Sequence, residues 1–241
     1  MNGLSFSTLL LDIEGTTSSI VFVHDVMFPF AKRELRGFLD EHFEDAELAP
    51  TWDAVAKGVG AANLDKLARH LNLPPKEALE RTAIRLMDAD AKSTGLKDLQ
   101  GKIWRRGFES SELKAHVYDD VPPALKRWKD AGLVVYIYSS GSVAAQQLFF
   151  GHTVSGDLRP FLSGHFDTTT GPKKEPESYR KIATAIGQSP ASILFFSDVV
   201  AELDAARSAG MQTGLMLRPG NAPVDGDHGH WMFENFDGIS S

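Results

Sequence analysis

The chain of 241 residues contains no cysteine. Without cysteine it can form no disulfide framework, thiolate nucleophile, zinc–thiolate site or cysteine-bound iron–sulfur cluster. It also lacks an excess of positive charge, because 25 Lys and Arg face 32 Asp and Glu and give a formal net charge of −7. Nucleic-acid binding depends mainly on Lys and Arg that neutralise phosphates. We therefore expect no nucleic-acid partner.

Long hydrophobic runs are missing as well. The first seven residues lack the basic and apolar regions of a signal peptide, and the later apolar runs are far shorter than a membrane span. Hydrophobic residues still make up 42% of the chain and charged residues 24%, which is typical of a globular protein with a sizeable core. We expect a cytoplasmic monomer without a membrane partner.

Four short apolar runs each end at polar residues, and helical patterns lie between them. The runs are residues 8–13, 133–138, 192–196 and 213–217. The segments 179–186 and 201–209 have helical spacing and are followed by Gly, and Asp119 and Asp120 are candidate caps for a helix that ends before Gly132. This alternation predicts an α/β fold with a doubly wound parallel sheet. The last twenty or so residues are mostly polar, and we expect a surface tail.

The alternation stops between about residues 18 and 117, where apolar side chains repeat with a period near 3.6 residues. Phe30, Leu35, Phe38 and Leu39 follow this spacing after Pro29, which suits a helix start. The sequence therefore predicts two domains. An α/β catalytic core comprises residues 1–17 and 118–241, and a helical cap, residues 18–117, is inserted into it.

Polar side chains follow three of the predicted strands directly. They are Asp12 and Glu14, then Ser139 and Ser140, then Asp198. Because ligands bind beyond the carboxyl ends of the strands in an open parallel sheet, these groups should converge. Carboxylate oxygens beside a phosphate suit Mg²⁺.

The first of these groups is a candidate for nucleophilic catalysis. The Asp12 carboxylate can attack phosphorus when a metal and cationic groups offset the charge that develops. Glu14 can donate a proton to the leaving oxygen and later activate water. In the alternative interpretation, Asp12 only caps a turn at the end of its strand.

The serines and lysines each allow two interpretations. Ser139 and Ser140 can donate to phosphate oxygens beside the amides of Gly141 and Ser142 at a helix start, or a serine can simply cap that helix. Lys173 or Lys174 can bridge Asp12 and a phosphate, or both can be solvated. Glu202 and Asp204 can favour their helix start through its dipole or bind metal.

The order of these motifs resembles the haloacid dehalogenase superfamily of phosphatases. The segments 11–17 and 135–142 resemble more narrowly the enolase-phosphatase (acireductone synthase) family of methionine salvage, and the strings 151–153, 164–168, 177–183 and 217–221 extend the similarity. The resemblance implies one Mg²⁺ per chain, with Asp12, Glu14 and Asp198 at the metal. It also implies Asp12 as nucleophile and Glu14 as acid and base.

The same resemblance implies that Ser139 and Ser140 hold the substrate phosphate. Lys173 matches the family lysine, with Lys174 as its rival. The implied reaction converts 2,3-diketo-5-methylthiopentyl 1-phosphate into the acireductone 1,2-dihydroxy-3-keto-5-methylthiopentene and phosphate, and no residue is assigned as the enolising base. The alternatives are a phosphatase of another small phosphorylated metabolite and a non-catalytic domain that binds such a metabolite.

Overall fold

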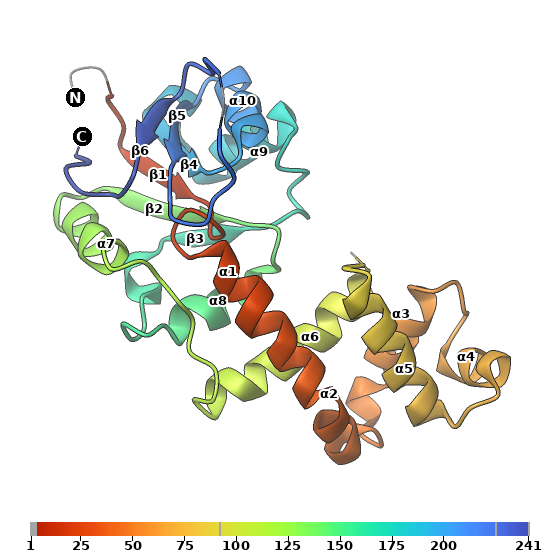
Figure 1. Ribbon diagram of the computed structural model, residues 1–241. Helices are drawn as coiled ribbons and strands as arrows, with labels where there is room; N and C mark the ends of the chain where they lie inside the picture. Colours follow the sequence, from red (N-terminus) through yellow and green to blue (C-terminus); the bar gives the residue numbers. More distant parts are fainter. Residues whose placement is uncertain (1–3, 92, 225, 241) are drawn as a thin grey trace. The chain divides into compact units, whose positions relative to one another are not determined.

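The computed structural model describes residues 4–91, 93–224 and 226–240. The chain divides into two compact units (Figure 1). One comprises Met1–Val23 and Lys114–Ser241, and the other is His24–Leu113. The second unit falls within the predicted insertion, residues 18–117, and its function as a cap stays a prediction.

The first unit is built on a six-stranded sheet in which every neighbouring pair is parallel. The strands are β1 (Thr8–Leu11), β2 (Val134–Tyr138), β3 (Gly164–Phe166), β4 (Ile193–Ser197), β5 (Gln212–Met216) and β6 (Trp231–Phe233). Their order is β3-β2-β1-β4-β5-β6. The predicted α/β class with a parallel sheet is confirmed. Because β1 pairs with both β2 and β4, the residues that follow these three strands emerge side by side.

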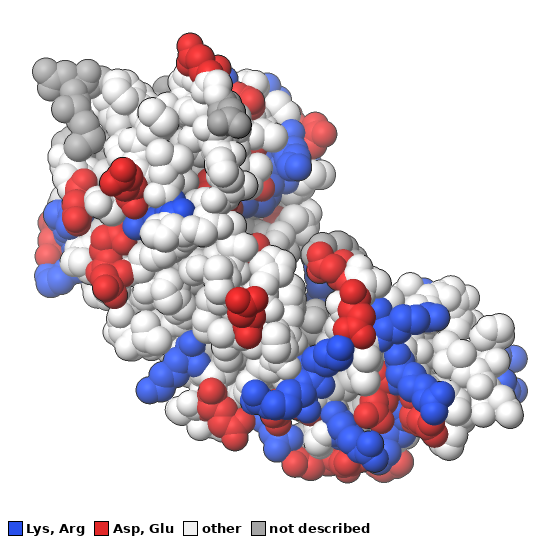
Figure 2. All heavy atoms as spheres, viewed as in Figure 1, with Lys and Arg blue, Asp and Glu red and all other residues white. Residues whose placement is uncertain are grey.

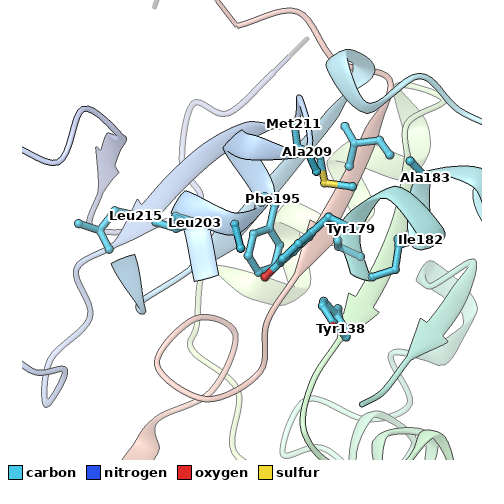
Figure 3. Close-up of a cluster of buried hydrophobic side chains, with 13 residues drawn as sticks. Tyr138, Tyr179, Ile182, Ala183, Phe195, Leu203, Ala209, Met211 and Leu215 are labelled. Carbon is cyan, nitrogen blue, oxygen red and sulfur yellow. The ribbon is translucent and has the colours of Figure 1, made fainter. Parts of the chain in front are cut away.

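The central strands β1 and β4 are mainly apolar because both faces of the sheet are covered. All residues of β1 and β4 are buried. Helices α9 (Pro176–Ile186) and α10 (Val200–Ser208) cover one face, while α7 (Val121–Asp130) and α8 (Val143–Gly151) lie on the other (Figure 1). Figure 3 shows the cluster under α9 and α10, where the Tyr179 ring lies between those of Phe195 and Tyr138, with centroid distances of 5.1 and 5.6 Å.

The C-terminal segment differs from the predicted surface tail. Residues of β6 pair with β5, and Phe236 and Ile239 are buried in the first unit. Trp128 on α7 donates its indole N–H to the Ile239 carbonyl, at 3.0 Å. The expectation of a surface tail is therefore wrong for residues 231–239, because the pairing of β6 and the burial of Phe236 and Ile239 hold this segment on the first unit.

Asp120 stands at the start of α7 as expected, but its side chain does not cap the helix. Its two carboxylate oxygens instead accept hydrogen bonds from Arg218, both at 2.8 Å. The Arg218 side chain is 3% exposed, so this bidentate ion pair is buried. Gly132 does end the turn after α7, in the left-handed region with φ of 76°.

The second unit is helical, as predicted. It contains α2 (Phe28–His42), α3 (Ala49–Lys57), α4 (Leu64–Leu71), α5 (Pro75–Asp88) and α6 (Thr94–Glu109). Short elements complete the chain: α1 (Ile20–Phe22), a π-helix at Val23–Met27, and 3-10 turns at Ala46–Leu48, Arg159–Phe161 and Pro190–Ser192. Gly95 lets α6 approach α3 closely, since a Cβ there would lie 2.2 Å from the Ala54 backbone.

Charged side chains of the helical unit are interleaved. On the face in Figure 2, Lys and Arg lie among Asp and Glu. The pairs Lys32–Asp88, Lys76–Asp40 and Arg106–Glu41 have N–O distances of 2.5, 2.7 and 2.8 Å. None of the helices within the described ranges is long and apolar enough to cross a membrane.

Candidate active site

Asp12 and Lys173 meet at the carboxyl end of β1. The Lys173 Nζ atom lies 2.7 Å from Asp12 Oδ2 and 2.6 Å from Glu202 Oε2. The three side chains are 9%, 7% and 11% exposed, respectively, so this ion-pair network is largely shielded from solvent. Lys174 is exposed. Of the two candidate lysines, Lys173 is therefore the one that contacts Asp12.

The Asp12 carboxylate is held in one orientation. Its Oδ1 atom accepts the Ile13 amide at 2.7 Å, and its Oδ2 atom contacts Lys173 and the Ser197 hydroxyl, the latter at 3.4 Å. The Asp12 amide donates to the Phe196 carbonyl at 3.0 Å, which continues the pairing of β1 with β4. Sheet pairing and ion pairing thus fix the direction of this side chain together.

The loop after Asp12 folds tightly around a single carbonyl. The amides of Thr16, Thr17 and Ser18 all donate to the Ile13 oxygen, at 3.2, 3.0 and 2.9 Å. Gly15 adopts a φ of 67°, and a Cβ at this position would lie 2.4 Å from Asp198 Oδ2. The left-handed conformation and this close approach both require glycine. The Asp198 carboxylate consequently packs against the loop that also carries Glu14, which is half-buried.

Glu202 is the site residue that the sequence reasoning did not select. The sequence suggests only a helix-dipole partner or a metal ligand, but Glu202 binds Lys173 and accepts a hydrogen bond from the Ser197 hydroxyl at 2.9 Å. The spacing of Glu202 from Asp198 is the sequence signal that could have identified it. Glu202 lies in the first turn of α10, four residues after Asp198, and that turn begins where β4 reaches the site. Asp204 instead binds Arg207 at the surface.

Negative charge exceeds positive charge at this edge of the sheet. Burial and the nearby charge of Asp12 raise the pKa of Asp198 to about 7. The same two causes raise the pKa of Glu202. Burial opposes the charge of Lys173, but the Asp12 and Glu202 carboxylates outweigh it, so the pKa of Lys173 lies above its ordinary value. One lysine therefore leaves the site short of positive charge, as expected where a cation binds.

The oxygen donors at this edge suit Mg²⁺ better than a softer metal. Within the described part of the chain, no three His, Asp or Glu side chains are grouped as a metal cage. Mg²⁺ does not need such a cage, because it is commonly held by one or two carboxylates, waters and substrate phosphate oxygens. Asp12 and Asp198 fit that pattern. Metal binding by Asp12, Glu14 and Asp198 stays a prediction.

The two serines after β2 lie in different environments. Ser139 is buried and its Oγ accepts the Gly141 amide at 3.3 Å, whereas Ser140 is exposed. Ser142 caps α8 through the Ala145 amide at 3.2 Å. The Gly141 amide, expected to face an anion, is thus directed to Ser139 in this structure. Phosphate binding by Ser139 and Ser140 stays a prediction.

The loop that carries Lys173 is anchored by three hydroxyl groups. Tyr138, Ser178 and Tyr179 donate to the carbonyls of residues 171, 172 and 173, at 2.9, 2.7 and 2.6 Å, respectively. We call this set the hydroxyl clamp. Tyr138 and Tyr179 belong to the cluster in Figure 3, so the clamp ties the lysine loop to the core. No pattern in the sequence indicates the hydroxyl clamp directly, because a buried tyrosine usually indicates only packing.

The parallel sheet, the aspartate after its first strand and the buried lysine partner define a hydrolase of the haloacid dehalogenase-like class. The family model described as haloacid dehalogenase-like hydrolase matches residues 6–210. Proteins named "Enolase-phosphatase E1" are similar over almost the whole chain. That of Sorangium cellulosum is 45% identical over 100% of both chains, and that of Synechococcus elongatus is 48% identical over 92% of this chain and 93% of its own. The chain belongs to the enolase-phosphatase E1 family of these hydrolases.

Solved structures share the fold of this chain. The Unknown transcript 4 protein of Saccharomyces cerevisiae has a TM-score of 0.81 and 36% identity, covering 98% of this chain and 100% of that protein. A dehalogenase with an intermediate complex has a TM-score of 0.56 and 16% identity, covering 97% of this chain and 95% of its own. The second likeness concerns the fold alone.

Proposed function

We propose that this chain is a Mg²⁺-dependent enolase-phosphatase, an acireductone synthase of methionine salvage. Its substrate is 2,3-diketo-5-methylthiopentyl 1-phosphate, and its products are 1,2-dihydroxy-3-keto-5-methylthiopentene and phosphate. The observation that carries the proposal is the full-length similarity to enolase-phosphatases at 45% identity. The contact of Lys173 with Asp12 supports the phosphatase half of the reaction.

Asp12 is the proposed nucleophile for phosphoryl transfer. Its carboxylate attacks phosphorus, the bond from phosphorus to the substrate oxygen breaks, and an aspartyl phosphate forms. Lys173 reduces the repulsion between this carboxylate and the incoming phosphate, and the low exposure of the pair strengthens that effect. Glu202 keeps the lysine ammonium in place from its other side.

Glu14 is the proposed acid and base. It gives a proton to the departing enolate oxygen and then takes one from the water that cleaves the aspartyl phosphate. Ser139 and Ser140 are the proposed phosphate contacts. Ser139 can leave Gly141 and donate its hydroxyl proton to a phosphate oxygen, since the Gly141 contact is long at 3.3 Å.

Asp12 and Asp198 would hold one Mg²⁺, together with the backbone carbonyl of Glu14. When bound, the cation supplies Lewis-acid stabilisation of a substrate carbonyl and of the phosphoryl oxygens. The excess of carboxylate charge and the oxygen donors support this assignment. We assign no enolising base.

The test is incubation of the purified protein with the diketo phosphate and Mg²⁺. We expect a rise in enediol absorbance and release of inorganic phosphate. Replacement of Asp12 by Asn should abolish phosphate release while the circular dichroism spectrum is unchanged, because the amide is a poor nucleophile. Phosphate release without enediol would favour a phosphatase of another metabolite, and unchanged turnover of Asp12→Asn would refute the nucleophile assignment.

Three further assignments belong to this proposal. We propose that the protein acts as a cytoplasmic monomer, that its only partner is the phosphorylated metabolite, and that residues 18–117 act as a cap over the site. The lack of cysteine is consistent with a reducing compartment. Sedimentation velocity of the purified protein tests the monomer assignment.

A further inference from the structure

The segment that follows β5 is bonded to the loop that carries Glu14. Arg218 donates its Nε–H to the Thr16 carbonyl at 3.1 Å. Asn221 donates through Nδ2 to the Gly15 carbonyl at 2.9 Å and to the Met216 carbonyl at 3.1 Å. Two consecutive carbonyls of the catalytic loop are therefore held by one neighbouring segment.

These contacts fix the orientation of the Asn221 amide. Both partners of Nδ2 are carbonyl oxygens, which only accept hydrogen bonds, so the nitrogen must face them and Oδ1 must face the other way. Among the described residues, the Asn221 Oδ1 atom is buried and has no hydrogen-bond partner. A buried carbonyl oxygen without a partner costs about 1–3 kcal/mol. This atom therefore needs a hydrogen donor.

The orphaned oxygen lies beside the proposed metal ligand Asp198. A Cβ on Gly15 would be 2.8 Å from Asn221 Oδ1 and 2.4 Å from Asp198 Oδ2, so both oxygens border the same small space. An amide oxygen and a carboxylate oxygen repel each other unless a donor lies close to both. Water molecules on a cation bound to the carboxylate are such donors, and Mg²⁺ usually keeps several of them.

We propose that Asn221 is an outer-sphere ligand of the cation site: its Oδ1 atom accepts a hydrogen bond from a water molecule on the Mg²⁺ ion that Asp198 binds. Its Nδ2 group meanwhile holds the Gly15 carbonyl. Asn221 acts through water and backbone, so it is a positioning residue. The inference deepens the proposed function and rests on its Mg²⁺ assignment.

Two variants distinguish the role of the Asn221 side-chain oxygen from the role of its amide nitrogen. Asn221→Ala removes both groups. Asn221→Asp keeps an oxygen toward the cation but loses the two Nδ2 donations to backbone carbonyls. If Asn221 only held the loop, both variants would weaken Mg²⁺ binding alike. If the oxygen contacts a metal-bound water, only the alanine variant weakens it.

Mg²⁺ affinity is measured by isothermal titration calorimetry of the metal-free, full-length protein with MgCl₂ and no substrate. We expect the dissociation constant to rise about 10- to 100-fold for Asn221→Ala, the usual effect of losing a second-shell partner. Asn221→Asp should bind Mg²⁺ at least as tightly as the parent protein. The exposed Asn235, replaced by Ala, is the matched control and should leave the affinity unchanged.

Equal weakening in both Asn221 variants, or none in Asn221→Ala, overturns the proposal while leaving the Mg²⁺ assignment intact. A parent protein that binds no Mg²⁺ overturns both. Thermal unfolding of each metal-free variant checks that it is folded. If Asn221→Ala is unfolded, Asn221→Ser takes its place, since its short hydroxyl side chain likewise removes the amide oxygen.

Discussion

Gly15 shows how a residue without a side chain determines the position of others. It turns the loop after β1 with a φ of 67° and leaves room for Asp198 Oδ2 and Asn221 Oδ1. Asp12 and Glu14 precede this turn directly. Any side chain at position 15 would separate groups that the site needs close together.

We expect Gly15→Ala to lower the catalytic efficiency by at least about tenfold, because displacement of catalytic groups by about 1 Å can reduce a rate about 100-fold. The added Cβ would also strain the left-handed backbone. Steady-state kinetics with the diketo phosphate measures the effect. The matched control is Gly101→Ala on α6, where a Cβ meets nothing within 4 Å. Equal activity in both variants would contradict the positional role of Gly15.

At the level of secondary-structure elements, the hydroxyl clamp connects the core to the chemistry. Tyr138 ends β2, while Ser178 and Tyr179 lie in the first turn of α9. Their hydroxyls hold three successive carbonyls, the last of which belongs to Lys173 itself. A strand and a helix thus position one lysine between two carboxylates.

Tyr179→Phe removes one bond of the clamp and leaves the ring packed against Phe195. We expect the free energy of unfolding to fall by roughly 1–3 kcal/mol, because the Lys173 carbonyl loses a buried donor. The turnover rate should also fall. The m-value, which is the slope of the unfolding free energy against urea concentration, should stay constant. Urea titration and kinetics give both values. A variant with lower stability but the turnover of the parent protein would show that the clamp is structural only.

The sequence predicted β1, β2, β4 and β5, because burial within the sheet leaves mainly apolar runs. It did not predict β3 or β6. These edge strands have three residues each, and Gly164–Phe166 is only half-buried. The sequence indicated Asp12, Lys173 and Asp198 by their positions after strands or before a helix. The roles of Arg218 and Asn221 could not be predicted, because they depend on contacts with a loop about 200 residues earlier.

For the whole molecule, several half-buried or buried histidines make stability depend on pH. Burial is the main cause that lowers the pKa of His116, His165 and His230. For His230, the charge of Arg207 adds to this effect, while Asp204 opposes it. The His230 side chain is fully buried, and its Nδ1 atom lies 2.8 Å from Thr213 Oγ1.

A histidine whose folded pKa lies below the unfolded value of 6.5 favours the folded state when neutral. Its contribution is complete above about pH 6.5 and is lost as the pH falls through the lower folded pKa. We therefore expect these histidines to contribute less stability at pH 5.5 than at pH 8, while the raised pKa of Asp198 acts in the opposite direction. Urea unfolding of the parent protein and of His230→Gln tests this: the variant should lose less stability on acidification. Equal losses would exclude His230 as a contributor.

The position of β1 at the centre of the sheet has a consequence for synthesis on the ribosome. Its partners β2 and β4 begin at Val134 and Ile193, so the apolar segment Thr8–Leu11 emerges long before either can pair with it. The helical unit, His24–Leu113, lies between β1 and β2 in the sequence, so all of it has been synthesised by then. Nascent chains should therefore gain helical structure first and keep β1 exposed, which makes this segment the natural contact for a chaperone.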